Sequence, residues 1–186
     1  MDRGPWIQTL TGRTWYPVAP QAEDVCDEDV AGAIAKVCRF GGHSTDFYSV
    51  AQHSVLVARL LKQSGASAAI QLQGLVHDAH EAYPPGDVLA PVKRIDFMHG
   101  GKMLERRAAL AVRAYFGVPG DLDRAVVHAD LAMLAAERRD VMAPSMVVWG
   151  DLPVPPAERI GTWTWQASRA IWLDLLTELR QEVRRG

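Results

Sequence analysis

The chain has 186 residues, of which 48% are hydrophobic and 23% charged, and its formal net charge at pH 7 is −2. This balance is ordinary for a globular chain and argues against a protein whose overall charge binds it to nucleic acid or to a membrane surface. The length suits one domain, residues 1–186, with a buried core. Two cysteines make no disulfide framework, and the sequence has neither an apolar signal core near its start nor a run of 18 apolar residues. We therefore expect a cytoplasmic protein.

The first half of the chain predicts a hairpin followed by three helices. Residues 5–20 carry aromatic and β-branched side chains around a Thr-Gly-Arg turn, which predicts a small β-hairpin. Residues 27–39 read as a helix, because apolar side chains share one face and acidic residues crowd its start. Two more helices are predicted over 49–63 and 66–82, separated at Gly65 and ended by a Tyr-Pro-Pro-Gly segment.

The second half predicts further helices and one irregular stretch. A short turn or helix start is expected over 91–96, followed by long helices over 102–116 and 121–139. Four prolines make 141–163 irregular, and a last helix covers 165–184. The fold class is therefore mostly α, with helices stacked around a polar centre.

Two histidines and two carboxylates interrupt the apolar faces of these helices. His53 lies in the first turns of one predicted helix, and the neighbours His77 and Asp78 lie within the next. A helix hairpin can bring His53 opposite His77, and Asp130 stands inside the apolar run 125–136. Buried polar groups are costly unless they are paired, and one metal ion would pair with all four. A single histidine would more simply be a hydrogen-bonded core residue, whereas the full nitrogen–oxygen set suits Mn²⁺, Fe²⁺, Co²⁺, Zn²⁺ or Mg²⁺.

The ordered set H…HD…D resembles the pattern of the HD-domain metal-dependent phosphohydrolases. The finer similarity is to HD-type 5′-deoxynucleotidases and phage-type dATP triphosphohydrolases, over about residues 25–140. Four segments carry it: Cys38-Arg39-Phe40, YSVAQHS at 48–54, HDAHE at 77–81 and GDVLAPVK at 86–93. The resemblance implies one HD domain, a helical bundle around a divalent metal site, with the helix at 165–184 added to its core.

The resemblance also implies which residues would bind the metal and move protons. The cofactor would be a divalent ion such as Co²⁺, Mn²⁺, Zn²⁺ or Mg²⁺, and its ligands would be His53, His77, Asp78 and Asp130. Glu81 would be the general acid/base, and its place four residues after His77 predicts the same helix face. Asp87 would orient the sugar or a water molecule.

Five further residues would contact the substrate by the same resemblance. Arg39 and Lys93 would hold phosphate oxygens, Phe40 would lie against the base, and Pro91 would help to wall the pocket. Gly42 stands where strict adenine-selective relatives carry a bulkier residue that contacts the base. The glycine therefore predicts looser base selectivity.

Several of these residues also have ordinary structural interpretations. Glu81 and Lys93 could be solvated charges, and Arg39 could be a cation favoured at the end of a helix. Asp87, which follows a turn, could be a helix N-cap. The loop after Glu81 is also slightly longer than the usual family spacing, which shifts Asp87, Pro91 and Lys93 relative to Glu81.

The expected activity is hydrolysis of a deoxynucleotide, first of all dATP to deoxyadenosine, with dADP and dAMP as further substrates. The alternatives are a 5′-deoxynucleotidase acting on dNMPs, a non-catalytic nucleotide-binding regulator and a helical protein with a structural ion. The sequence has no P-loop, so phosphate binding should rest on the metal and on cationic side chains. We expect no nucleic-acid polymer and no membrane as partner. Because family relatives form dimers or rings, we expect a homo-oligomer, with the Trp-rich C-terminal helix as a candidate surface.

Overall fold

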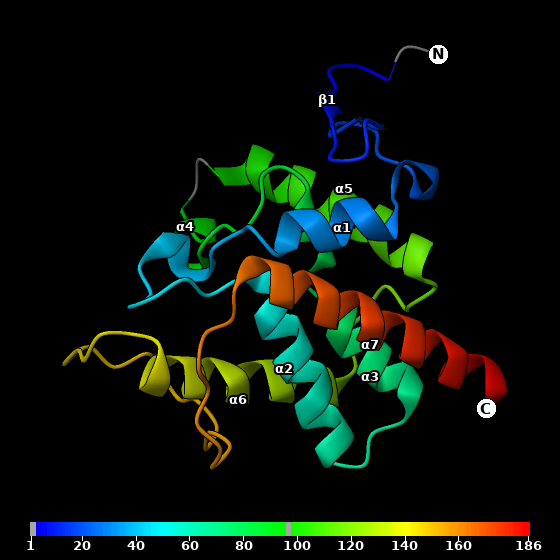
Figure 1. Cartoon of the computed structure of the whole chain (residues 1–186). Helices are drawn as coiled ribbons and strands as arrows, with labels where there is room; N and C mark the ends of the chain where they lie inside the picture. The colour runs from blue at the N-terminus through cyan, green and yellow to red at the C-terminus, as the bar shows by residue number, and fades with distance from the viewer. Residues whose placement is uncertain (1–2, 96–97) are drawn as a thin grey trace.

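A β-hairpin lies near the N-terminus of the computed structural model, which describes residues 3–95 and 98–186. Strands β1 (Ile7–Gln8) and β2 (Thr14–Trp15) pair antiparallel, with Ile7 opposite Trp15. The Trp15 side chain is fully buried and stacks on the ring of Tyr83, with 3.7 Å between centroids. The predicted hairpin is confirmed, and Trp15 anchors it to the helical body below it (Figure 1).

Three helices follow the hairpin: α1 (Asp27–Ile34), α2 (Val50–Gln63) and α3 (Ala68–Val76). Helices α2 and α3 each begin at a serine N-cap, Ser49 and Ser67, whose hydroxyl accepts a backbone N–H of the first turn. A short loop joins these two helices, so they pack against each other as a helical hairpin (Figure 1).

The second half holds α4 (Ala90–Lys93), α5 (His99–Phe116), α6 (Arg124–Asp140) and α7 (Trp165–Arg185). Helix α6 packs against α2 and α3, while α7 crosses α1, α2 and α3 (Figure 1). The segment 141–163 between them contains neither helix nor strand, as its prolines predicted. The mostly α class with a small N-terminal hairpin is therefore confirmed.

Two groups of buried side chains hold these helices together. The larger joins the hairpin to α1, α2, α3, α5 and α7, and it includes Trp172, whose indole Nε1 donates to the carbonyl of Leu75 at 3.1 Å. The smaller joins α2 to α6 through residues such as Val57, Leu61 and Met133. Together they fix α2, α3 and α6 relative to one another. Among the predicted metal ligands, His53 lies on α2, His77 follows the last residue of α3, and Asp130 lies on α6.

Within the described parts of the chain, we find no helix with the length and apolar character needed to cross a bilayer.

The helix predicted over 27–39 ends at Ile34, earlier than expected. The backbone of the following segment pairs with the start of α2: the N–H of Arg39 donates to the carbonyl of Tyr48 at 2.9 Å, and that of Val50 donates to Val37 at 3.1 Å. A 3-10 turn, η2 (Arg39–Gly42), follows this pairing. Arg39 is therefore held by a tertiary contact and not by a helix end, which corrects the interpretation of it as a cation at a helix terminus.

The prediction of one helix over 66–82 was also wrong in its extent, because α3 ends at Val76. The ring Nδ1 of His77 donates to the carbonyl of Gly74 at 2.7 Å, which satisfies one of the free carbonyls at the helix end with a side chain. A separate 3-10 turn, η3 (Ala79–Ala82), then carries Glu81. The segment expected over 91–96 appears as the single turn α4, and its residue 96 lies outside the described residues.

Candidate metal centre

Two buried histidines face each other where α2 meets the end of α3. His53 lies on the first turn of α2 and is completely buried, and His77 is the C-cap residue of α3 and is 4% exposed. Their Nε2 atoms are 3.3 Å apart. The helical hairpin predicted from the break at Gly65 therefore does bring His53 opposite His77.

The other ring nitrogen of each histidine has an acceptor of its own. His53 Nδ1 lies 2.6 Å from Glu137 Oε1, and His77 Nδ1 lies 2.7 Å from the carbonyl oxygen of Gly74. A carbonyl can only accept, and the pKa of Glu137 is lowered by Arg39 and His53 against the opposing effect of burial, so its carboxylate also accepts. Both Nδ1 atoms are therefore donors, and both rings direct their Nε2 atoms to the same point.

Asp130 adds a carboxylate oxygen to this point. Its Oδ1 lies 3.1 Å from His53 Nε2 and 3.8 Å from His77 Nε2. Ligand atoms of His53, His77 and Asp130 all lie within 4.8 Å of one another, so the three residues could hold a metal ion. Two imidazole nitrogens and a carboxylate form the mixed donor set that borderline divalent metals accept.

Asp78 lies beside this group of three. Its Oδ2 is 3.1 Å from His77 Nε2, 3.8 Å from His53 Nε2 and 3.5 Å from Arg39 Nη1. Its pKa is well below the usual range, because the charges of His77 and His53 outweigh the opposing effect of burial. The structure thus places Asp78 next to the histidines, and its role as a fourth ligand stays a prediction.

The two histidine Nε2 atoms and the neighbouring carboxylates need a positive charge between them. Burial and the Arg39 charge lower the pKa of His53, but Glu137 and Asp130 raise it to about 9, so a proton can supply that charge. A divalent ion can supply it as well, because metal binding displaces protons from its ligands. The residues present therefore fit a divalent metal ion.

Glu81 is the third residue of η3 and lies close enough to Asp78 for that charge to affect it. It is 5% exposed, and its Oε2 has no hydrogen-bond partner. Burial, followed by the charges of Asp78 and Asp87, raises its pKa well above the usual value. The solvated helix-end interpretation is therefore wrong, and the 3-10 turn, not an i+4 relation on an α-helix, sets its position.

Arg39 is a buried cation between two carboxylates. Its Nη1 lies 3.5 Å from Asp78 Oδ2 and its Nη2 lies 3.1 Å from Glu137 Oε2. Burial alone would lower its pKa, but the charges of Glu137 and Asp78 raise it. The guanidinium is thus fixed next to the candidate ligands, and its contact with phosphate stays a prediction.

Lys93 and Asp87 come from the segment that follows η3. Lys93 is half-buried on α4, and its Nζ lies 2.5 Å from Glu105 Oε1 of α5. Burial lowers the pKa of Lys93, but the hydrogen bond to Glu105 raises it, so the amine stays charged. Burial raises the pKa of Asp87. The N-cap of α4 is Leu89, so Asp87 does not have the N-cap role.

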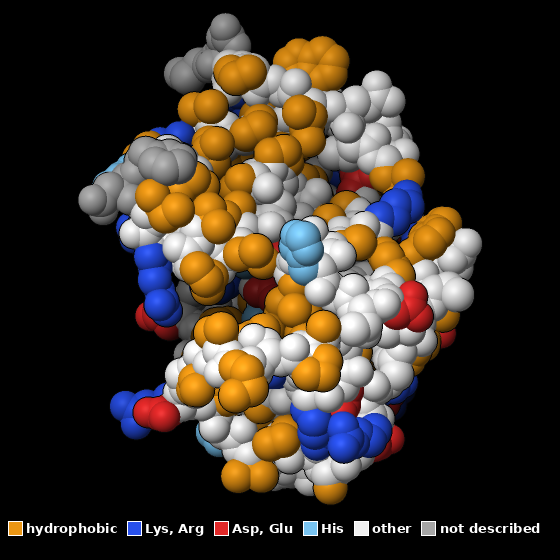
Figure 2. Space-filling model, turned by 90° about the vertical axis from the view of Figure 1, so that its left-hand side faces the viewer, with side chains coloured by type: hydrophobic (Ala, Val, Ile, Leu, Met, Phe, Trp, Pro, Cys, Tyr) orange, Lys and Arg blue, Asp and Glu red, His pale blue; other side chains and the backbone are white. Residues whose placement is uncertain are grey.

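The predicted base contacts lie near the surface. Phe40 adopts φ 57°, a left-handed conformation, and its ring lies 5.8 Å from that of Trp149 in the loop after α6. Gly42 is exposed and Pro91 is exposed on α4. Figure 2 shows a hollow on this side of the molecule, with an acidic side chain at its depth and hydrophobic side chains around it. The contacts of Phe40, Gly42 and Pro91 with a base stay predictions.

Three residues near the candidate centre were missed at the level of sequence. Glu137 supports His53 and Arg39, Glu105 holds Lys93, and Trp149 packs against Phe40. Only Glu137 had a signal, because it follows Asp130 by seven residues and so shares its helix face at the end of the apolar run. The other two depend on contacts between distant segments, which no local pattern contains.

Comparison with known proteins places the chain in a family without adding an activity. The chain matches no family model. It is 37% identical over 152 residues to the uncharacterized protein YfdR of Escherichia coli (strain K12), covering 82% of this chain and 81% of that protein. It is 38% identical over 143 residues to the uncharacterized protein RCAP_rcc00048 of Rhodobacter capsulatus, covering 72% of each. The chain therefore belongs to the same family as YfdR.

Proposed function

We propose that this protein is a metal-dependent phosphohydrolase of the HD-domain type that acts on deoxynucleotides. The observation that carries the proposal is the convergence of two histidine Nε2 atoms and the Asp130 carboxylate, together with the buried Glu81, whose Oε2 has no hydrogen-bond partner and whose pKa the charge of Asp78 raises. Arg39 lies next to the same group, 3.5 Å from Asp78. Metal ligands, a proton carrier and a phosphate-binding cation are thus assembled from segments that are far apart in the sequence.

Each side chain has a task in this reaction. A divalent ion held by His53, His77 and Asp130 would supply Lewis-acid polarisation of a phosphoryl oxygen. Glu81, whose pKa is raised by burial, holds a proton toward neutral pH and can donate it to a leaving oxygen. Arg39 and Lys93 stabilise the negative charge that develops on the phosphate.

The first candidate substrate is dATP, which would be converted to deoxyadenosine and tripolyphosphate, with dADP and dAMP as further substrates. The resemblance over the four segments in residues 38–93 supports this choice, and the exposed Gly42 leaves space beside Phe40 for a base. A 5′-deoxynucleotidase acting on dNMPs would use the same groups. A non-catalytic nucleotide-binding regulator would have no need for a buried proton carrier such as Glu81.

The test is an HPLC assay of the purified protein with Co²⁺ or Mn²⁺ against all dNTPs, dNDPs and dNMPs. We expect dATP to give deoxyadenosine and tripolyphosphate in one step. Turnover of monophosphates alone, with release of orthophosphate, would assign the protein to the nucleotidases. Absence of turnover with every substrate, in protein that binds the metal, would refute the enzyme and favour the regulator.

A further inference from the structure

A fully buried carboxylate on α6 joins the candidate metal centre to its neighbouring cation. Glu137 lies two helical turns after Asp130 and none of its surface is exposed. Its Oε1 lies 2.6 Å from His53 Nδ1 and its Oε2 lies 3.1 Å from Arg39 Nη2. Both oxygens thus have a partner that is remote in sequence, and the two partners come from different elements, η2 and α2.

Stability alone does not account for a carboxylate at this position. Removing a carboxylate and a guanidinium from water costs several kcal/mol for each ion, and apolar side chains of similar volume are often as stable or more stable. Met133, one turn before Glu137 on the same helix face, and the preceding Ala136 are buried and apolar. A charged group buried next to them therefore indicates a role in orienting its partners.

We propose that Glu137 is a positioning residue of the metal centre. It accepts a hydrogen bond from His53 Nδ1–H and so holds the ring in the tautomer whose Nε2 lone pair would be available to a metal ion. Its second oxygen holds Arg39 beside Asp78, so that one carboxylate orients both a metal ligand and the phosphate-binding cation. This role rests on the proposed metal centre but does not depend on which nucleotide is hydrolysed.

The two histidines differ in the support that they receive. His77 donates its Nδ1 proton to a neutral backbone carbonyl, that of Gly74, whereas His53 donates to a charged carboxylate. A carboxylate partner makes the imidazole a stronger base and a stronger metal ligand. A substitution of Glu137 removes the hydrogen-bond acceptor of His53. The acceptor of His77 is a backbone carbonyl and stays in place, so His77 serves as an unchanged reference within the same site.

The experiment compares metal binding by wild-type protein and by Glu137→Gln. The amide has nearly the same shape but lacks the negative charge, and it cannot accept from His53 and Arg39 at once. We expect the affinity for Co²⁺ and for Mn²⁺, measured by calorimetry, to fall by about 10- to 100-fold. We also expect the visible absorption of the Co²⁺-loaded protein to change, because the His53 ring is no longer held in one orientation.

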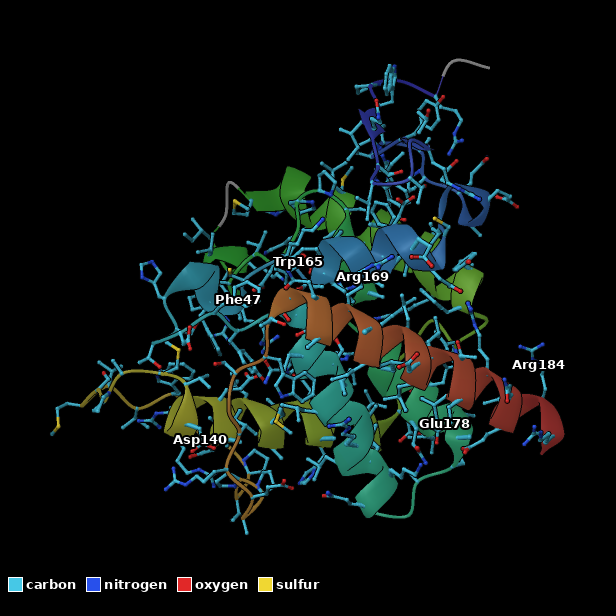
Figure 3. The ribbon with its side chains drawn as sticks, viewed as in Figure 1. Phe47, Asp140, Trp165, Arg169, Glu178 and Arg184 are labelled. Atoms are coloured by element: carbon cyan, nitrogen blue, oxygen red, sulfur yellow. The ribbon has the colours of Figure 1, made fainter. Side chains whose placement is uncertain are left out.

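Asp140→Asn is the matched control. Asp140 is the other carboxylate of α6 that is little exposed and pairs with arginine, but its partners are Arg139 on the same helix and Arg159 in the following loop. Figure 3 shows Asp140 at the C-terminal end of α6. We expect this variant to lose stability in urea and to bind Co²⁺ with wild-type affinity. A purely structural role for Glu137 would give Glu137→Gln the same result as this control.

The outcomes separate the inference from the proposed function. Wild-type Co²⁺ affinity and absorption in folded Glu137→Gln would overturn the role of Glu137 and leave the enzyme proposal standing. Metal binding that Glu137→Gln weakens, in a wild-type protein that hydrolyses no nucleotide, would refute the enzyme alone. A wild-type protein that binds neither Co²⁺ nor Mn²⁺ would overturn both.

A measurement on the wild-type chain keeps the test valid if Glu137→Gln does not fold. In protein loaded with Zn²⁺, ¹⁵N NMR of the histidine side chains reports which ring nitrogen carries the proton. We expect a protonated Nδ1 on His53, with the strong downfield proton shift of a hydrogen bond to a carboxylate. A His53 ring that binds Zn²⁺ through Nδ1, or that has no bound Nδ1 proton, would overturn the inference.

Discussion

At the scale of single residues, the surroundings of Glu81 determine what its carboxyl group can do. Oε2 is buried without a hydrogen-bond partner, and burial together with the charges of Asp78 and Asp87 favours the protonated form. A carboxyl group whose pKa is moved toward neutrality can act both as acid and as base at physiological pH. Because Glu81 follows the ligand segment in a separate turn, its removal should affect the proton transfer and not the metal.

Glu81→Gln should retain the metal and lose turnover. The amide keeps the shape of the side chain but can neither donate nor accept the catalytic proton, so kcat should fall by about 10²- to 10⁴-fold. Elemental analysis after dialysis measures the bound metal, and HPLC of the products measures the rate. Turnover near the wild-type level would contradict the assignment of Glu81, and loss of the metal would make it a ligand instead.

His53, His77 and Asp130 could be predicted as a metal-binding group because each interrupts an apolar helix face. Glu137 has the same property and was nevertheless overlooked, since its meaning depends on Arg39, which is 98 residues away in sequence. Asp78 illustrates the opposite case: its neighbour His77 made it an obvious candidate, yet its carboxylate also faces Arg39. Sequence patterns thus indicate which polar residues lie on apolar helix faces, whereas their burial and their partners depend on the tertiary fold: the Asp130 side chain is 38% exposed.

At the scale of elements, the close contact between α2 and α3 sets the distance between the two histidines. Gly74 lies where the helices meet, and a Cβ added there would come within 2.4 Å of Leu61 Cδ1 and 3.5 Å of Val57 Cγ1. Leu61 is 1% exposed and has little room to move. A larger residue at position 74 must therefore displace the end of the Leu61 side chain, and because that side chain is buried we expect α3, and with it His77, to move away from α2.

Gly74→Val should lower both stability and metal affinity. Overpacking in a buried contact costs about 1–3 kcal/mol, and the displaced helix separates the two Nε2 atoms that would share the ion. Urea unfolding and Co²⁺ calorimetry measure the two effects. Gly100→Val, on α5 where an added Cβ meets nothing within 4 Å, is the control for substituting a β-branched residue into a helix. An unchanged Co²⁺ affinity in Gly74→Val would show that the helix contact does not set the site.

The end of α6 is tied to the following loop by Asp140. Its carboxylate accepts from Arg139 and Arg159 and from the backbone N–H of Ile160 at 3.0 Å. The hydrogen bond from Arg139 is the main reason why the pKa of Asp140 is lowered, against the weaker effect of burial. A carboxylate with a lowered folded-state pKa stabilises the fold above its unfolded pKa of about 4, and this stability is lost as the pH falls through the folded value.

Asp140→Asn should therefore destabilise the protein at pH 7 and have less effect in acid. We expect a loss of about 1–3 kcal/mol at pH 7, because hydrogen bonds to a charged group are broken. The difference from wild type in urea midpoint should shrink between pH 4 and pH 3. Glu178→Gln, which removes an exposed pair with Lys62, should change stability by less than about 1 kcal/mol. An equal difference at pH 7 and pH 3 would contradict the ionic origin.

The order and type of the long helices could be predicted from apolar periodicity and from glycine and proline breaks. Helix ends were harder, and the end of α3 shows why. The ring of His77 donates a hydrogen bond to the Gly74 carbonyl, and the chain then forms η3. The segment 66–82, which looks like one helix in the sequence, is therefore two elements. A hydrogen bond from a side chain to a backbone carbonyl does not change the hydrophobic periodicity. It nevertheless ends the α-helix and so affects the position of Glu81.

At the scale of the whole molecule, the candidate ligands connect three helices that apolar packing and a few hydrogen bonds already hold together. His53 belongs to α2, His77 ends α3 and Asp130 lies on α6, and the three come within 4.8 Å of one another. The unfolded chain has no such group, since the ligands are 24 and 53 residues apart in sequence. An ion bound by all three therefore binds the folded protein in preference to the unfolded one.

Metal binding should consequently raise the stability of the whole chain as one cooperative unit. At a Co²⁺ concentration about 100 times the Kd, the gain is about 2.7 kcal/mol, which corresponds to a rise in Tm of about 5–10 °C for a domain of this size. Circular dichroism and tryptophan fluorescence should report the same midpoint, because Trp15 and Trp172 belong to one core. Asp130→Ala removes the α6 ligand without touching that core, so its Tm should stay nearly constant on adding Co²⁺. An equal rise in Asp130→Ala and wild type would show that the ion binds elsewhere, and two separate transitions would divide the chain into independent units.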